Sequence, residues 1–198
     1  MWTDGQKLLP SSIVENYEVH DWRHATAILS SNYTKELEEM IEALTTFHLR
    51  KSEIMAPGGG KSPISSFFER ALHRYGWVEK RFDTEIVIDG KSRENPTHKI
   101  DLYKNQIALE IEWNNKDPFY DRDLNNFRIL HELGIISVGI MITRSDELQD
   151  IFDRLGKGAS YGPSTTHMSK LLPRIDGGGA GGSPILIFGI TKKLYVSH

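Results

Sequence analysis

Three carboxylates within one short segment have the residue types and spacing that suggest chemistry. Asp101 is followed by Glu110 and Glu112 in a stretch that otherwise alternates apolar and polar side chains. Alternation with a period of two predicts β-strands, in which residues two apart share a face. Converging carboxylates repel one another unless a cation neutralises them, and Mg²⁺ is a hard ion that one or two carboxylates hold together with water and phosphate oxygens. The pattern therefore predicts that Asp101, Glu110 and Glu112 converge on one Mg²⁺ site.

A β-hairpin would bring these carboxylates together. With a two-residue turn at 104–105, Tyr103 pairs with Gln106 and Asp101 pairs with Ala108. Glu110 then becomes the diagonal neighbour of Asp101, at roughly 7 Å between Cα atoms. The opposite face of the second strand is apolar and is expected to pack; its residues are Ile107, Leu109, Ile111 and Trp113. On spacing alone, a half-exposed hairpin with an acidic polar face is the commoner explanation.

The flanking segments predict an α/β fold, with a mixed central β-sheet flanked by helices. Strands are expected over 80–89, 98–103, 106–113, 135–143 and 184–190. Helices are expected to begin after caps at Thr34, Ser62-Pro63, Asp117-Pro118 and Ser145. We expect one domain over 1–198, in which 1–60 is mainly helical and 61–190 forms the catalytic core.

Composition narrows the class of protein. The 198 residues contain no cysteine, which excludes disulfides, thiolate zinc sites and a thiol nucleophile. No apolar leader or membrane-length run is visible, so a soluble cytoplasmic protein without a membrane partner is expected. The net charge of −3 is unlike that of a general nucleic-acid binder, but a local basic patch suffices for phosphate contacts.

The carboxylate segment resembles the core of PD-(D/E)xK nucleases, and more specifically the BamHI, BglII and BstYI group of type II restriction endonucleases. The step from Asp101 to Glu110 is similar to that in BglII and BstYI, and Glu110-Ile-Glu112 looks like BamHI, where a second glutamate replaces the usual lysine. Four further segments resemble the group in the same order along about 63–190: Ser62-Pro63-Ile64 to Gly76-Trp77-Val78-Glu79, Asp153-Arg154, Ala159-Ser160-Tyr161 and 184–190.

This resemblance implies a restriction-endonuclease-like core and a homodimer that cuts a short palindrome in double-stranded DNA, leaving 5′-phosphates. Because relatives act at sites centred on GATC, that core is the first to test. It implies Mg²⁺ between Asp101, Glu110 and the scissile phosphate, with Glu112 orienting or deprotonating the attacking water. Glu79 is a further catalytic candidate, although the BamHI acid lies one position later relative to its tryptophan.

The resemblance also implies DNA contacts. In this group of enzymes, side chains just after the catalytic strand reach into the major groove. The residues at that place here are Asn114, Asn115 and Lys116. Asn can hydrogen-bond adenine, and Lys can reach guanine. A solvated turn is the alternative for these three. Four other candidates are Asp153, Arg154, Ser160 and Lys61. For Asp153-Arg154 the alternative is an exposed helix end, and for Lys61 it is a solvated loop lysine.

The same likeness places the dimer interface on about 117–133 and 164–172. The apolar candidates, for which intramolecular core is the alternative, are Tyr120, Leu124, Phe127, Met168 and Leu171.

Two other motifs are incomplete. The run 58–62 ends like a phosphate-binding loop, but Met55 stands where its first glycine belongs, so no nucleotide cofactor is expected. His20 and His24 have zinc-site spacing without a third ligand, and a helix carrying them is expected. The competing functions are a repair or junction-resolving nuclease, a non-catalytic DNA-binding protein and a small-molecule α/β enzyme.

Overall fold

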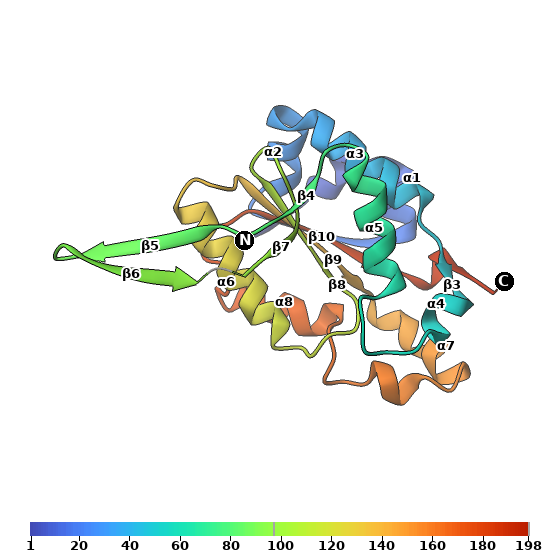
Figure 1. Cartoon of the computed structure of the whole chain (residues 1–198). Helices are drawn as coiled ribbons and strands as arrows, with labels where there is room; N and C mark the ends of the chain where they lie inside the picture. Colours follow the sequence, from blue (N-terminus) through green and yellow to red (C-terminus); the bar gives the residue numbers. More distant parts are fainter. Residues whose placement is uncertain (97, 198) are drawn as a thin grey trace.

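Within the described residues, 1–96 and 98–197, seven strands form one mixed sheet in the order β1-β2-β10-β9-β8-β7-β4 (Figure 1). We describe the fold from a computed structural model. The strands are β1 (Trp2–Thr3), β2 (Tyr17–Trp22), β10 (Ile185–Ile190), β9 (Val138–Arg144), β8 (Ile107–Glu112), β7 (Ile100–Lys104) and β4 (Val78–Lys80). The central β8, β9 and β10 are parallel, and their outer neighbours pair antiparallel. The predicted α/β class with a mixed sheet is confirmed.

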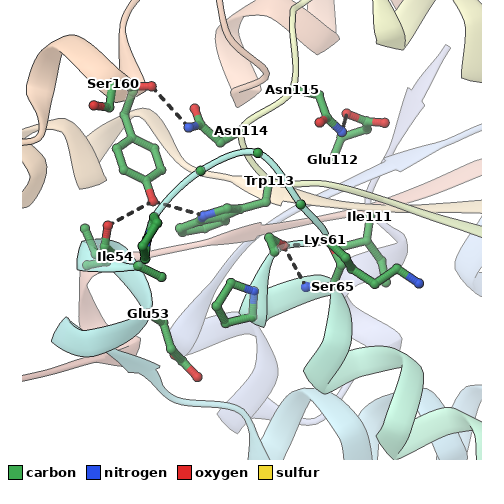
Figure 2. A pocket seen from close by; sticks show the side chains of 18 of the residues that line it. Glu53, Ile54, Lys61, Ser65, Ile111, Glu112, Trp113, Asn114, Asn115 and Ser160 are labelled. Carbon is green, nitrogen blue, oxygen red and sulfur yellow. Dashed lines mark hydrogen bonds between the residues drawn. The ribbon is translucent and has the colours of Figure 1, made fainter.

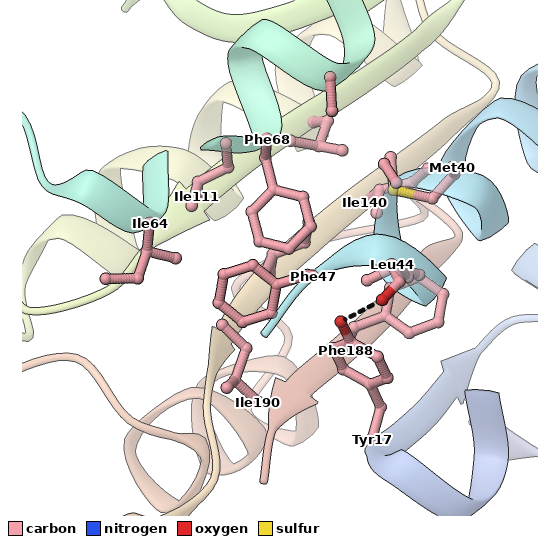
Figure 3. Close-up of a cluster of buried hydrophobic side chains, with 14 of the residues drawn as sticks. Tyr17, Met40, Leu44, Phe47, Ile64, Phe68, Ile111, Ile140, Phe188 and Ile190 are labelled. Atoms are coloured by element: carbon pink, nitrogen blue, oxygen red, sulfur yellow. Dashed lines mark hydrogen bonds between the residues drawn. The ribbon is translucent and has the colours of Figure 1, made fainter. Parts of the chain in front are cut away.

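Helices cover both faces of this sheet (Figure 1). They are α1 (Ser11–Asn16), α2 (Ala25–Asn32), α3 (Thr34–Thr46), α4 (Lys51–Met55), α5 (Pro63–His73), α6 (Phe119–Glu132), α7 (Gln149–Arg154) and α8 (Met168–Asp176). One core joins α1–α5 and α7 to the face that carries Ile140 and Phe188 (Figure 3), and a second joins α6 and α8 to the face that carries Met141 and Ile187. Burial on both faces explains why β9 and β10 are almost continuously apolar.

Of two helix starts that were predicted from capping residues, the structure confirms one and contradicts the other. Ser62 caps α5 as predicted, because its Oγ accepts a hydrogen bond from the backbone of Ser65 at 3.0 Å and Pro63 is the first helical residue. The predicted cap at Thr34 is wrong. Thr34 is already inside α3, and its Oγ1 donates to the carbonyl of Ser30 at 2.9 Å, because α2 continues into α3 after a single residue.

The first sixty residues contribute three strands that the prediction missed: β1, β2 and β3 (Leu49–Arg50). β2 pairs antiparallel with the whole of β10. His20 therefore lies on a strand rather than on the expected helix, and its Nε2 contacts Glu18 at 2.9 Å. Pairing with β2 satisfies the backbone groups of β10, which would otherwise form an edge of the sheet.

The single strand predicted over 80–89 is divided in two. β4 ends at Lys80, and β5 (Asp83–Ile88) pairs with β6 (Lys91–Pro96) in a separate hairpin that projects from the body of the protein (Figure 1). Its turn, Asp89-Gly90, has φ values of 51° and 73°, as a two-residue hairpin turn of type I′ requires.

The apolar residues suggested for a dimer interface are intramolecular core. Tyr120, Leu124, Phe127, Met168 and Leu171 are all fully or almost fully buried in the second core, between α6, α8 and the sheet. These side chains are therefore not available to a second copy. In the part of the chain that the structure describes, no helix has the length and apolar character needed to cross a bilayer.

Candidate active site

The β7–β8 hairpin places Asp101 and Glu110 on the same face of the sheet. Its turn is Asn105-Gln106, with φ values of 44° and 67°, and Tyr103 pairs with Ala108. The predicted turn at 104–105 is therefore wrong, and Glu110 rather than Ala108 lies opposite Asp101. Because side chains alternate with a period of two, a shift of two positions leaves every side chain on its predicted face.

Hydrogen bonds across the two strands hold this carboxylate pair. The backbone N–H of Ile111 donates to Oδ2 of Asp101 at 3.0 Å, and the backbone N–H of Asp101 donates to Oε2 of Glu110 at 3.3 Å. Glu110 is only 1% exposed, and its other oxygen, Oε1, is buried with no hydrogen-bond partner among the described residues. A buried carboxylate oxygen without a donor is costly, so its position favours a cation.

Burial sets the proton affinities of the cluster. It raises the pKa of Asp101 to about 6, although the hydrogen bond from Ile111 acts in the opposite direction. Burial, followed by the charges of Asp123 and Asp101, raises the pKa of Glu110 well above its ordinary value. Burial and the charge of Asp123 likewise raise the pKa of Glu112. Without a cation, the cluster therefore retains protons that exposed carboxyls would lose, and a metal ion would displace them.

Two further acids join this cluster from helices, and both were missed in the sequence. Asp123 on α6 is completely buried, and its charge acts on Glu110 and Glu112. Glu69 on α5 lies close enough to raise the pKa of Asp101 further. Asp123 could have been found, because it falls on the same helical face as Tyr120 and would be the only acid in that apolar stripe.

Glu112 is oriented by two polar side chains. The amide of Asn115 donates to its Oε2 at 2.8 Å, and Nη2 of Arg122 lies 3.4 Å from its Oε1. Arg122 also donates from Nε to Asp123 at 2.7 Å, and its guanidinium lies over the ring of Phe119 at 4.3 Å. These contacts leave Glu112 with one defined position beside the carboxylate pair.

The residues present fit a divalent cation held by two protein carboxylates. No group of three or more His, Asp or Glu side chains in the described residues has the arrangement of a complete metal site. Asp101 and Glu110 remain as a pair, and Mg²⁺ commonly takes one or two carboxylates and completes its six ligands with water and phosphate oxygens. The unpartnered Oε1 of Glu110 is the structural observation that favours this occupancy.

A cavity of about 690 Å³ opens beside the cluster, between the glycine-rich loop 57–61, the end of β8 and the segment around Ser160 (Figure 2). Asp101 and Glu112 line it. Four of the predicted DNA contacts line it as well: Lys61, Asn114, Asn115 and Ser160. Nζ of Lys61 pairs with Glu69 at 2.6 Å, next to Asp101. The fold therefore brings six predicted site residues to one cavity.

Of the other predicted site residues, Glu110 is buried beside Asp101 and does not line the cavity, and four lie elsewhere. Glu79 is exposed, and its carboxylate pairs with Nζ of Lys99 at 2.6 Å. Asp153 and Arg154 are exposed at the end of α7, in agreement with the exposed helix end considered as an alternative. Lys116 is also exposed and forms a β-bridge with Thr165.

The sequence of the chain was compared with those of known proteins and protein families. No curated protein matches the chain. The restriction endonuclease BglII/BglIII family matches residues 17–190, which include every helix and strand of the candidate site. The match agrees with the resemblance inferred from the carboxylate segment. The chain therefore belongs to the BglII/BglIII family of restriction endonucleases, which are type II site-specific deoxyribonucleases.

Proposed function

We propose that this restriction endonuclease cuts both strands of a short palindromic sequence in double-stranded DNA, uses Mg²⁺ and leaves 5′-phosphates. The observation that carries the proposal is the cross-strand pair Asp101 and Glu110. Glu110 is buried with an unpartnered carboxylate oxygen, and Asp101 lines the cavity together with candidate DNA contacts. A homodimer supplies one such site for each strand. Restriction takes place where foreign DNA is met, so we propose a cytoplasmic location.

Asp101 and Glu110 would hold the ion. When bound, Mg²⁺ supplies charge that stabilises the developing negative charge on the phosphate and lowers the pKa of water. The cross-strand hydrogen bonds fix the two carboxylates before the substrate arrives, so little reorganisation is needed.

Glu112 orients the attacking water and accepts its proton. Arg122 and Asn115 hold the two oxygens of this carboxylate in place. Arg122 also places a positive charge beside the position where a glutamate replaces the usual lysine of the superfamily. Since burial raises the pKa of Glu112, its carboxylate binds a proton more readily than an exposed glutamate does.

DNA contacts come from the rim of the cavity. Lys61 would leave Glu69 and contact a phosphate, as a point charge. Asn114, Lys116 and Ser160 would reach base edges, and Asn115 would do so with the amide hydrogen and oxygen that do not contact Glu112. Asp153 with Arg154 would extend the contact from the end of α7. Glu69 is better placed than Glu79 to act on the cluster, because its charge reaches Asp101.

Cleavage of an intact supercoiled plasmid tests the proposal. With Mg²⁺ the protein should produce discrete fragments whose mapped ends share one palindromic sequence, starting with sites centred on GATC. With EDTA it should produce none. Ca²⁺ should support binding without cutting, because it accepts oxygen ligands with looser geometry. Cleavage that requires nicks, flaps or junctions would instead indicate a repair nuclease, and binding without cleavage would indicate a non-catalytic protein.

Variants connect the activity to the carboxylate pair. Asp101→Ala and Glu110→Ala should each lower the cleavage rate about 100-fold or more, through lost charge stabilisation. Glu42→Ala, which removes an exposed glutamate of α3, is the control and should cut normally. Substantial Mg²⁺-dependent cutting by either site variant would contradict the assignment.

A further inference from the structure

We infer that Arg144 determines how accurately this enzyme recognises its sequence, by holding two DNA-facing loops together without contacting DNA. The inference rests on the proposed function. The loops are the first loop, residues 113–118 after β8, and the second loop, residues 160–167 before α8. Arg144 is the last residue of β9 and does not line the cavity beside the carboxylates.

Arg144 binds the second loop from inside the protein. It is only 1% exposed. Nε donates to the carbonyl of Thr166 at 2.9 Å, and Nη2 donates to the carbonyl of Tyr161 at 2.9 Å and to Oγ1 of Thr165 at 2.7 Å. Its guanidinium also lies 5.3 Å from the ring of Phe152. One rigid side chain therefore fixes three points along the second loop.

The second loop in turn fixes the backbone of the first. The N–H of Thr166 donates to the carbonyl of Asn115 at 2.9 Å, and the N–H of Asn115 donates to Oγ1 of Thr166 at 3.2 Å. The N–H of Asp117 donates to the carbonyl of Ser164 at 3.1 Å. The amide of Asn114 donates to the carbonyl of Ser160 at 3.1 Å (Figure 2). Arg144 thus reaches the candidate base contacts Asn115 and Asn114 through the second loop.

A separate anchor holds the far end of the second loop. Asp146 accepts hydrogen bonds from the backbone N–H of Ser169 at 2.9 Å and from its hydroxyl at 2.8 Å, and it contacts Nδ1 of His167 at 2.6 Å. α8 therefore stays attached when Arg144 is replaced. The expected consequence is looseness confined to 160–166 and to the first loop, rather than loss of the fold.

Recognition of bases depends on this rigidity. A side-chain amide discriminates between bases only when its backbone holds it in hydrogen-bonding geometry. Burial of Arg144 lowers its pKa to about 10, so the charge is kept inside the protein at a desolvation cost. Within the described chain, all side-chain hydrogen bonds of Arg144 go to the second loop. What the buried charge provides in return for its desolvation cost is therefore the fixed position of that loop.

The test compares the sequences at which the wild type and the variants cut, rather than their cleavage rates alone. A library of duplexes with random sequence is incubated with Mg²⁺ and protein, and the cut ends are sequenced. The wild type should cut at one consensus. The quantity compared is the ratio of cutting at sites that differ from the consensus by one base pair to cutting at the consensus itself. Arg144→Met should raise this ratio about 10-fold. Arg144→Lys should behave like Arg144→Met, because an ammonium cannot reproduce the planar fork of donors.

Two further variants separate positioning from general destabilisation. Thr165→Val removes one acceptor of Arg144 at a half-buried position and should raise near-consensus cutting about threefold; it replaces the Met variant if that variant does not fold. Tyr17→Phe removes the buried hydrogen bond that Tyr17 donates to the carbonyl of Leu44 at 2.8 Å (Figure 3), a contact that involves neither loop, and should keep the wild-type ratio. Melting curves show whether the variants are comparably destabilised.

The outcomes distinguish the inference from the function on which it rests. If the wild type cuts at no consensus, the proposed function fails and the inference fails with it. If the wild type has a consensus and Arg144→Lys and Thr165→Val keep its full preference, only the inference is overturned. An equal loss of preference in Tyr17→Phe would also overturn it, because the effect would then follow stability rather than loop position.

Discussion

Replacing Asp101 with asparagine should stabilise the metal-free protein while removing its nuclease activity. Asparagine has the same shape, and its Oδ1 can still accept the hydrogen bond that Ile111 donates at 3.0 Å. The change removes a carboxylate that is largely buried and surrounded by other acids, since burial, Asp123 and Glu69 all raise the pKa of Asp101. Residues selected to bind a cation are expected to lower stability when the cation is absent.

The size and sign of the effect follow from the pKa. Folding raises the pKa of Asp101 from 3.8 to about 6, so the folded state holds a proton that the unfolded chain has lost. The free energy of unfolding therefore falls as pH rises from about 4 to 6, and remains lower above that window. Two pKa units correspond to about 3 kcal/mol as an upper limit, which relaxation and water reduce to about 1–3 kcal/mol.

Thermal unfolding in EDTA measures this gain. For a chain of this size, about 1–3 kcal/mol corresponds to a rise in Tm of roughly 3–10 °C at pH 8, with about half the gain in free energy at pH 5. Asp21→Asn is the matched control, since Asp21 is a buried acid in the same sheet that accepts hydrogen bonds from Thr26 at 2.7 Å. This control should gain no stability.

Added Ca²⁺ completes the experiment. It should stabilise the wild type more than Asp101→Asn, because the ion binds the folded site and the variant lacks one ligand. If Asp101→Asn is no more stable than the wild type at pH 8, or gains equally at every pH, the account of a strained metal-free cluster is refuted.

Asn115→Ala should weaken binding to the specific duplex by about 1–3 kcal/mol and leave binding to random DNA nearly unchanged, as fluorescence anisotropy in Ca²⁺ can measure; equal losses would mean that Asn115 contacts no base. Sedimentation at micromolar protein should find a homodimer without DNA, because a palindrome requires two identical half-site contacts. A monomer that cuts both strands in one encounter would contradict this. Lys104→Met should lower the free energy of unfolding by about 3–5 kcal/mol in urea titrations, because Glu39 would stay buried without the cation at 2.6 Å, keeping only the hydrogen bond from Trp77 at 2.8 Å. An unchanged midpoint would show that Glu39 finds water or another donor.

Patterns that depend on near neighbours could be predicted from the sequence. The start of α5 follows from Ser62 and Pro63, because a capping hydroxyl and a proline act within one turn of helix. The common face of Asp101, Glu110 and Glu112 follows from the period of two along a strand. The family follows from motifs in a fixed order, and the match over 17–190 confirms it.

The register of the β7–β8 hairpin required the structure. Gln106 adopts a positive φ of 67°, which residues other than glycine, asparagine and aspartate seldom do, so the sequence favoured a turn one residue earlier. The pairing of β2 with β10 was likewise hidden, because β2 carries polar residues and its partner lies more than 160 positions away along the chain. Such long-range pairing depends on which strand of the assembled sheet still has unpaired backbone groups, and local sequence does not show this.

Convergence in space was also decided by the tertiary fold alone. Asp123 and Glu69 belong to different helices. Glu69 resembles an ordinary polar position and Asp123 stands out only as an acid in an apolar stripe, and neither reveals its neighbours until α5 and α6 pack on opposite faces of the sheet. Arg144 ends an apolar strand and carries no motif, yet packing directs its guanidinium to the loop that holds Asn115. The sequence alone determined the carboxylates, their shared face and the family. Which acids, arginines and loops surround those carboxylates was determined by tertiary packing, because burial and distance are properties of the assembled chain rather than of local sequence.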